Sequence, residues 1–212
     1  MEKYSYIIWD FNGTLYNDVD VCLSCAQRLM AAHGLQPIST PEEYRAIFGF
    51  PIVDYYARMG FDFDKTPYAD LAVEWVAYYN EESAAAKLSD GALETLSAIA
   101  ARRIPQLVLS ATEQTMLEGQ ILSLGIRSYF DELLGLSNIH AHSKAGIALA
   151  WRAQHPDARL LMIGDTDHDA EVAKEMGADC ILVTSGHQSR ATLSRCQSLC
   201  VIDDIRDVLK QF

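Results

Sequence analysis

The sequence lacks the features typical of membrane, secreted and nucleic-acid-binding proteins. None of its apolar segments approaches the ~18 residues that a membrane helix requires. Glu2 and Lys3 lead directly into a strand-like segment, so we expect no signal peptide. Lysine and arginine number 17 against 29 acidic residues, which gives a net charge of −12, and no basic cluster stands out. We therefore expect neither nucleic acid nor an anionic membrane as a partner.

Cysteine is scarce and odd in number. The five cysteines are scattered through apolar surroundings, which is typical of the reducing cytoplasm, and we predict that location. Cys22 and Cys25 form a C-x-x-C pair, and Cys196 and Cys200 lie four residues apart. Each pair is either a redox or zinc site or a set of core contacts on a helix face. We favour core contacts, because neither pair has neighbouring histidines or a glycine-rich loop.

Apolar, strand-like segments recur along the chain. They cover residues 4–9, 106–110, 132–136, 159–163, 180–184 and 199–202. From the second of them onward, the strands alternate with helical patterns at residues 113–124, 144–154, 167–176 and 188–194. This alternation predicts an α/β fold with a doubly wound, Rossmann-like parallel sheet.

The long segment between the first two predicted strands reads almost wholly as helix. Apolar residues at helical spacing predict a helix over residues 19–33, and Thr40-Pro41-Glu42-Glu43 is a typical helix start. Further helices are expected at residues 52–59 and from Thr66 to about Lys87. We predict a helical cap of residues 17–89, inserted into a core made of residues 1–16 and 90–212.

Four polar features follow predicted strands or open the next helix. Asp10 and Ser110 each follow a strand, and Lys144 opens a helix. The fourth feature is Gly164-Asp165-Thr166-Asp167-His168-Asp169, directly after an apolar strand. Because parallel strands end at one edge of a sheet, we expect these residues to converge there.

This set of residues suits phosphoryl transfer. A carboxylate such as Asp10 can attack phosphorus only when a cation offsets the charge of the phosphate, and Mg²⁺ prefers oxygen ligands. We predict that Asp10, Asp165 and the backbone carbonyl of Asn12 hold the ion, with Asp169 as further support.

The same reasoning assigns the phosphate-binding residues. Lys144 adds a positive charge beside phosphate and nucleophile, and Ser110 and the backbone amide of Ala111 donate hydrogen bonds to phosphate oxygens. Thr14 supports the first loop, and we count it among the substrate-binding residues.

The whole chain resembles the haloacid-dehalogenase-like hydrolase superfamily. The four motifs of that superfamily correspond to Asp10-Phe11-Asn12-Gly13-Thr14, Ser110, Lys144 and the segment from Gly164 to Asp169. The resemblance implies an aspartyl-phosphate on Asp10, a Mg²⁺ requirement and a small phosphorylated metabolite as substrate. Small helical-cap phosphatases similar to phosphoglycolate phosphatase look most alike, and Phe48-Gly49-Phe50-Pro51 resembles their substrate-facing cap loop.

Asn12 departs from the family pattern, which has an aspartate at this position for proton transfer. An amide cannot protonate a leaving group, so we expect reduced or unusual phosphatase activity, with Asp18 or His168 as speculative proton donors.

The alternatives to such a phosphatase are a silent protein that binds a phosphorylated ligand or a protein partner, and a metal-independent dehalogenase. A dehalogenase would leave the paired acids Asp165 and Asp169 without a purpose. A phosphonate-cleaving enzyme is disfavoured, because the cap lysines Lys65 and Lys87 lie far from the Phe48 loop.

Other polar and aromatic residues carry weaker predictions. For His140, His142, His168 and His187 we favour solvated loop positions over metal binding. For Arg45 we favour a surface ion pair over a substrate contact. The aromatic residues of the third cap helix (Tyr68, Trp75, Tyr78 and Tyr79) are expected to pack inside the cap. The sequence is compatible with a monomer or a homodimer.

Overall fold

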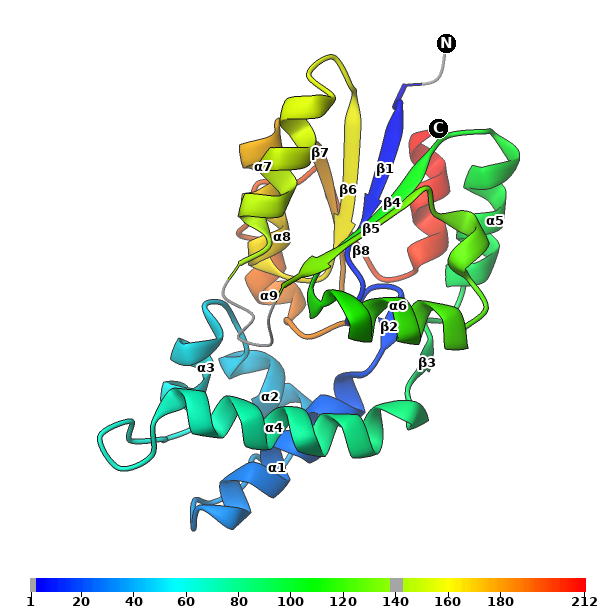
Figure 1. Ribbon diagram of the computed structural model, residues 1–212. Helices are drawn as coiled ribbons and strands as arrows, with labels where there is room; N and C mark the ends of the chain where they lie inside the picture. The colour runs from blue at the N-terminus through cyan, green and yellow to red at the C-terminus, as the bar shows by residue number, and fades with distance from the viewer. Residues whose placement is uncertain (1–2, 138–142) are drawn as a thin grey trace.

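The core is a six-stranded parallel sheet. A computed structural model describes residues 3–137 and 143–212, and Figure 1 shows the sheet with the cap beneath it. The strand order is β5-β4-β1-β6-β7-β8, and every neighbouring pair is parallel. The strands are β1 (Tyr6–Trp9), β4 (Gln106–Glu113), β5 (Glu132–Leu136), β6 (Leu160–Gly164), β7 (Asp179–Val183) and β8 (Cys200–Ile202). The predicted α/β class with a parallel sheet is confirmed.

Helices cover both faces of this sheet, because the side chains of each strand alternate between two apolar layers. In β1, Ile7 and Trp9 belong to one layer and Ile8 to the other. The first layer lies under α5 (Ala92–Ala101) and the 3₁₀ helix η3 (Ile205–Gln211), and the second under α7 (Ala145–Gln154) and α8 (Asp167–Met176). The core also contains α6 (Gln114–Ser123), η2 (Arg127–Tyr129) and α9 (Arg190–Leu193).

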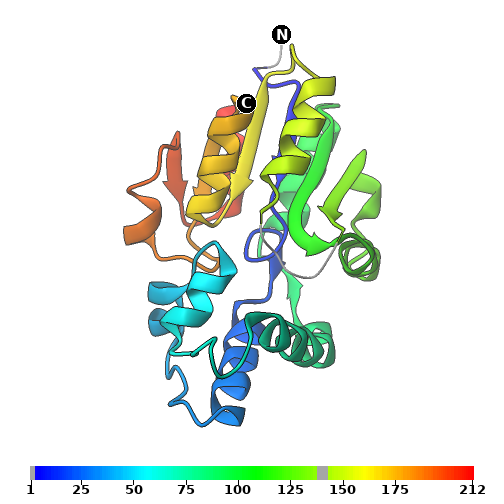
Figure 2. The same cartoon turned by 60° about the vertical axis from the view of Figure 1, so that its left-hand side comes forward.

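The inserted segment forms a separate helical lobe at the carboxyl ends of the strands (Figures 1 and 2). Its helices are α1 (Val19–Ala32), α2 (Pro41–Ile47), α3 (Ile52–Arg58) and α4 (Tyr68–Glu82). Thr40 caps α2 by accepting a hydrogen bond from the Glu43 amide, with Pro41 in the first turn, as predicted. Within the described residues no helix is both long and apolar enough to cross a membrane.

Two short strands connect the lobes. β2 (Tyr16–Asn17) leaves the core and pairs antiparallel with β3 (Lys87–Leu88), which returns to it. The predicted helix to about Lys87 therefore ends early, at Glu82, and η1 (Ser83–Ala85) follows it. The reason is that the returning chain must be extended to pair with the outgoing one.

Two predictions near the C-terminus also need correction. The helix expected over residues 188–194 is only the single turn α9. Cys196 follows that turn and Cys200 lies in β8, so they do not share a helix face, although Cys22 and Cys25 do lie in α1 as expected. Residues 188–200 are mostly polar. Two apolar residues four positions apart, such as Cys196 and Cys200, are too short a pattern to distinguish a helix from a strand.

A buried glutamine on β4 yields a stability prediction. The side-chain oxygen of Gln106 accepts a hydrogen bond from Trp9 Nε1 at 2.9 Å, and its Nε2 donates to the Leu96 carbonyl at 3.1 Å. Gln106→Leu leaves the buried indole N–H without a partner, so we expect the free energy of unfolding in urea to fall by about 1–3 kcal/mol. Gln154→Leu, at an exposed glutamine, should change it by less than about 0.5 kcal/mol. Equal effects of the two substitutions would contradict the assignment.

Candidate active site

The predicted site residues meet at the carboxyl edge of the sheet. Asp10 follows β1, which lies between β4 and β6 in the sheet. The backbone amide of Asp10 donates a hydrogen bond to the Ile163 carbonyl. Ser110 lies in β4, and Asp165 directly follows β6. The order of strands therefore brings three distant parts of the sequence to one place, as the parallel topology predicts.

Lys144 lies at the centre of this group. Its side chain is 2% exposed, and its ammonium contacts Asp10, Asp169 Oδ1 at 2.6 Å and the Leu109 carbonyl at 3.0 Å. Burial alone would lower the pKa of Lys144, but the two carboxylates raise it, so the group stays charged. Lys144 thus holds a fixed positive charge against the predicted nucleophile.

The acidic residues outnumber this one cation. Asp10, Asp165 and Asp169 are buried, and one carboxylate oxygen of each lies within 4.8 Å of the others. Burial raises the pKa of Asp10 well above its usual range despite Lys144, and burial raises the pKa of Asp165 to about 6. Three buried carboxylates around one ammonium suit an additional divalent cation, and hard oxygen donors are the ligands that Mg²⁺ prefers. The residues therefore fit the predicted magnesium ion.

The loops around Asp165 hold its carboxylate tightly. Thr14 Oγ1 donates to Asp165 at 3.0 Å, and the His187 amide donates at 2.7 Å. A Cβ atom on Gly13, which has a φ of +75°, would lie 2.3 Å from Asp165 Oδ2, and one on Gly186 would lie 2.1 Å from it. Only glycine permits this close approach, so both loops are shaped around the carboxylate.

Asp169 is held by its own helix start. Its Oδ2 accepts hydrogen bonds from Thr166 Oγ1 at 2.6 Å and from the Thr166 amide at 2.9 Å, which completes a capping box. Although burial would raise the pKa of Asp169, Lys144 and these hydrogen bonds lower it. The carboxylate is therefore fixed in place and ionised.

Asn12 is fully engaged in hydrogen bonds between core and cap. Its Nδ2 donates to Asp18 Oδ2 at 2.7 Å and to the Tyr79 hydroxyl at 3.0 Å, and its Oδ1 accepts from Thr112 Oγ1 at 2.7 Å. An aspartate would lack the two donor hydrogens. The amide therefore matches its surroundings, and those surroundings include a neighbouring carboxylate.

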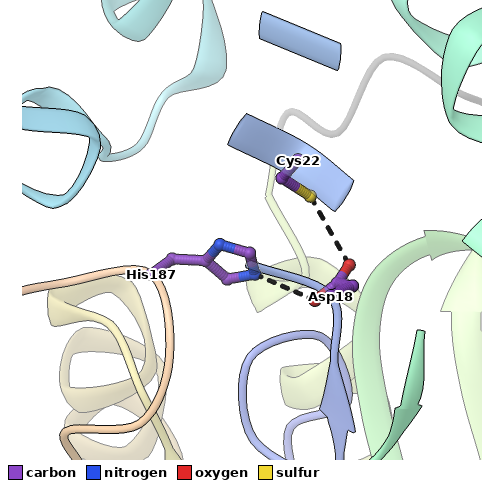
Figure 3. A group of neighbouring side chains, drawn as sticks. All are labelled: Asp18, Cys22 and His187. Atoms are coloured by element: carbon purple, nitrogen blue, oxygen red, sulfur yellow. Dashed lines mark hydrogen bonds and ion pairs between the residues drawn. The ribbon is translucent and has the colours of Figure 1, made fainter. Parts of the chain in front are cut away.

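That carboxylate, Asp18, is the centre of a second buried cluster. Figure 3 shows the Asp18 carboxylate joined to both His187 and Cys22. His187 Nε2 lies 3.2 Å from Asp18 Oδ1, and Cys22 Sγ lies 3.5 Å from Asp18 Oδ2. The three groups have the chemistry and proximity of metal ligands. However, Asp18 also accepts hydrogen bonds from Gly13 N at 3.1 Å and from the Tyr79 hydroxyl at 2.7 Å. The Asp18 carboxylate is therefore an ion-pair partner of His187 that is also held by these two hydrogen bonds.

The pKa shifts of the buried residues bear on which of them can protonate a leaving group. Burial would raise the pKa of Asp18, but His187 and the hydrogen bonds lower it, so Asp18 is ionised and is not the proton donor considered from the sequence. Burial would lower the pKa of His187, but Asp18 raises it. Burial lowers the pKa of His168, the other candidate, which disfavours its acid form at neutral pH.

A cavity of about 170 Å³ lies between the site and the cap. Asp10, Asn12, Ser110, Ala111 and Lys144 line its core side. Thr14 lies behind Asp165, fully buried, and is not among the lining residues. The predicted cap loop contributes Phe48 and Phe50, and the stripe of α4 contributes Tyr68, Trp75 and Tyr79 rather than packing only inside the cap.

The remaining sequence predictions have different outcomes. Arg45 makes no ion pair with the part of the chain that the structure describes; its Nε instead donates to the Gly186 carbonyl at 2.8 Å and joins cap to core. His187 and His168 are buried rather than solvated, and His168 stacks on Phe50. His140 and His142 lie outside the described residues.

Sequence reasoning missed the Asp18–His187–Tyr79 network. These residues come from the start of the cap, a core loop and a cap helix, and no spacing rule connects them. One signal was available: Asp18 follows Asn12 by six residues across a tight Gly-Thr turn, which brings the two side chains back together.

Comparisons with known proteins agree with this fold. A family model described as haloacid dehalogenase-like hydrolase matches residues 7–183. The probable phosphatase IndB of Dickeya dadantii is 23% identical over 214 residues, 96% of this chain and 91% of that protein. The phosphoglycolate phosphatase of Synechococcus elongatus is 24% identical over 189 residues, 88% and 87% of the two chains. A haloacid dehalogenase-like family protein from Streptococcus pneumoniae superposes with a TM-score of 0.85 at 20% identity, covering 99% of each chain.

The contact between Asn12 and Asp18 predicts the effect of restoring an aspartate. Asn12→Asp places two carboxylates together and removes two donors, so we expect the free energy of unfolding at neutral pH to fall by about 1–3 kcal/mol. Adding Asp18→Asn should recover part of this loss, because one amide and one carboxylate again face each other. Asn17→Asp, at an exposed position nearby, is the matched control and should have little effect in urea unfolding. An Asn12→Asp protein as stable as the parent would show that the amide is not needed there.

Proposed function

This chain belongs to the haloacid dehalogenase-like hydrolase family, and we propose that it is a magnesium-dependent phosphatase acting on a small phosphorylated metabolite. One observation carries the proposal: a carboxylate, Asp10, is held by a buried lysine beside two further buried carboxylates and lines the core side of a cavity. Two proteins named as phosphatases are similar to this chain along most of its length.

In the proposed reaction Asp10 is the nucleophile. A carboxylate oxygen of Asp10 attacks phosphorus, the bond to the leaving oxygen breaks, and an aspartyl-phosphate forms. Water then attacks this phosphorus, which releases phosphate and restores the Asp10 carboxylate. Lys144 offsets negative charge near the nucleophile, and the Ser110 hydroxyl and the Ala111 amide donate hydrogen bonds to the phosphoryl oxygens.

Magnesium completes the charge balance of the proposed site. Asp10, Asp165 and the carbonyl of Asn12 would hold the ion, with Asp169 beside them, and its charge offsets the repulsion between the carboxylate and the phosphate. We also propose that the protein is located in the cytoplasm and is a monomer or a homodimer.

Asn12 limits which substrates react. General acid catalysis contributes about 10²–10⁴-fold, and the Asn12 amide cannot supply it. Leaving groups of low basicity need no proton from the enzyme as the bond breaks. Acyl phosphates and aryl phosphates therefore suit this site better than alkyl phosphates do.

A substrate panel tests the proposal. With Mg²⁺ we expect purified protein to hydrolyse acetyl phosphate and phenyl phosphate at least about tenfold faster, as kcat/KM, than phosphoglycolate or a sugar phosphate. EDTA should abolish the activity, and Asp10→Asn should lower it at least about 10³-fold, because the nucleophile is lost. No hydrolysis above the Asp10→Asn control would refute the phosphatase.

The same assays separate the alternatives. Binding of a phosphorylated ligand without turnover would favour the silent protein, and halide release in the presence of EDTA would favour the dehalogenase. In the double substitution Asn12→Asp with Asp18→Asn, the carboxylate returns without the repulsion described above. Alkyl phosphate turnover should then rise relative to aryl phosphate turnover, and an unchanged ratio would show that Asn12 does not limit proton transfer.

A further inference from the structure

The wall of the cavity opposite Asp10 is built of aromatic rings from the cap. It contains no charged side chain from the described part of the cap other than Asp18, which is already paired with His187. Trp75 and Tyr79 stack on each other with ring centroids 5.0 Å apart. Six of the aromatic residues in this wall are Phe48, Phe50, Tyr55, Tyr56, Trp75 and Tyr79. Such a wall favours an apolar or aromatic group.

The described lining residues leave no positive charge free for an anionic leaving group. Lys144 is occupied by Asp10 and Asp169, and His187 by Asp18. Glu113, also in the lining, adds a negative charge. A substrate that carries a second anion, such as a carboxylate, would have to lose its hydration here without a partner.

The nearest cap arginines do not change this conclusion. Arg45 Nε donates to the Gly186 carbonyl, and Arg58 Nε donates to the Ile47 carbonyl at 2.6 Å. Neither residue is in the lining. Arg45 thus links the cap to a core loop, and Arg58 links two segments of the cap.

One polar group of the wall is without a partner. Tyr55 lines the cavity and is only 3% exposed, and its buried hydroxyl makes no hydrogen bond within the described residues. A buried hydroxyl in that state gains a partner when a ligand brings a polar atom to it. Tyr55 is therefore suited to hold one uncharged polar substituent.

We infer that the substrate is the phosphate ester of a small, uncharged phenol whose ring lies in this cavity with a polar substituent at Tyr55. The inference rests on the proposed phosphatase activity and narrows its substrate class. The size agrees, because an apolar cavity of about 150 Å³ accommodates benzene. The chemistry agrees as well, because a phenol leaves without the proton that Asn12 cannot give.

A pair of esters with leaving groups of similar acidity tests the charge requirement. Phenyl phosphate and 3-carboxyphenyl phosphate differ mainly in the carboxylate, and we expect kcat/KM to be at least about tenfold higher for phenyl phosphate. Equal values, or a preference for the carboxylated ester, would overturn the inference.

Hydroxylated esters test the role of Tyr55. For at least one of 3- and 4-hydroxyphenyl phosphate, kcat/KM should exceed that of phenyl phosphate, and Tyr55→Phe should remove this preference. If the parent protein shows no such preference, the role assigned to Tyr55 is wrong.

A substitution that fills the cavity tests where the ring lies. Ala72 lines the cavity and is 5% exposed, whereas Val73 on the same helix is 57% exposed and faces away. Ala72→Phe should lower the ratio of kcat/KM for phenyl phosphate to that for acetyl phosphate at least about tenfold. Val73→Phe should leave this ratio unchanged, and circular dichroism should show that both variants are folded. An unchanged ratio in folded Ala72→Phe would contradict the inference.

Binding of substrate analogues keeps the test independent of turnover. Calorimetry with Mg²⁺ should show benzylphosphonate binding at least about tenfold more tightly than 3-carboxybenzylphosphonate. If acetyl phosphate is hydrolysed through Asp10 but neither assay shows the preference, the inference is wrong and the proposed function stands. If nothing is hydrolysed, the proposed function fails, and calorimetry alone decides whether the cavity selects an uncharged ring.

Discussion

The ammonium of Lys144 is the charge on which the site depends. It lies among carboxylates that come from two strand ends and one helix start, and its own residue precedes α7. Without it, Asp10, Asp165 and Asp169 would be three buried acids in mutual contact, an arrangement that raises the pKa of each carboxyl group. The buried lysine keeps Asp169 ionised and opposes the rise in the pKa of Asp10. Lys144, the residue before α7, therefore offsets part of the negative charge that the strand ends bring together at this edge of the sheet.

A second set of polar contacts sets the position of the cap. Asp18, at the start of the cap, pairs with His187 of the core, and the Tyr44 hydroxyl of α2 lies 2.8 Å from His187 Nδ1. Asn12 connects the first loop to α4 through Tyr79. Buried hydrogen bonds of this kind specify one arrangement of the two lobes more strictly than apolar contact does. The shape of the cavity follows from that arrangement, since its walls belong to different lobes.

The sequence predicted the core side of the site and one cap loop, Phe48–Pro51, whose Phe48 and Phe50 line the cavity, but not the polar contacts between cap and core. Asp10, Ser110, Lys144 and Asp165 could be placed together because strand ends in a parallel sheet share an edge, whatever the details of packing. The contacts of Asp18, Tyr79 and Arg45 depend on how one lobe rests on the other, and hydrophobic periodicity contains no information on that. The same limitation explains the early end of α4. The pairing of β3 with β2 is a long-range contact, and it overrides a local helical pattern that continues to about Lys87.

In the proposed phosphatase, Asn12 and the aromatic wall would select for the same property of a substrate, a leaving oxygen of low basicity. The missing general acid corresponds to about 3–5 kcal/mol of activation free energy when the leaving oxygen is strongly basic. An apolar cavity adds to that cost, because an alkoxide that forms beside it is poorly solvated. A phenolate spreads its charge into the ring, which lowers both costs, and under the proposal the ring would also gain from contact with Trp75 and Tyr79, which line the cavity. Under the proposed function, the amide at position 12 and the cavity would therefore act together in substrate selection, and Asn12 would not simply impair the catalyst.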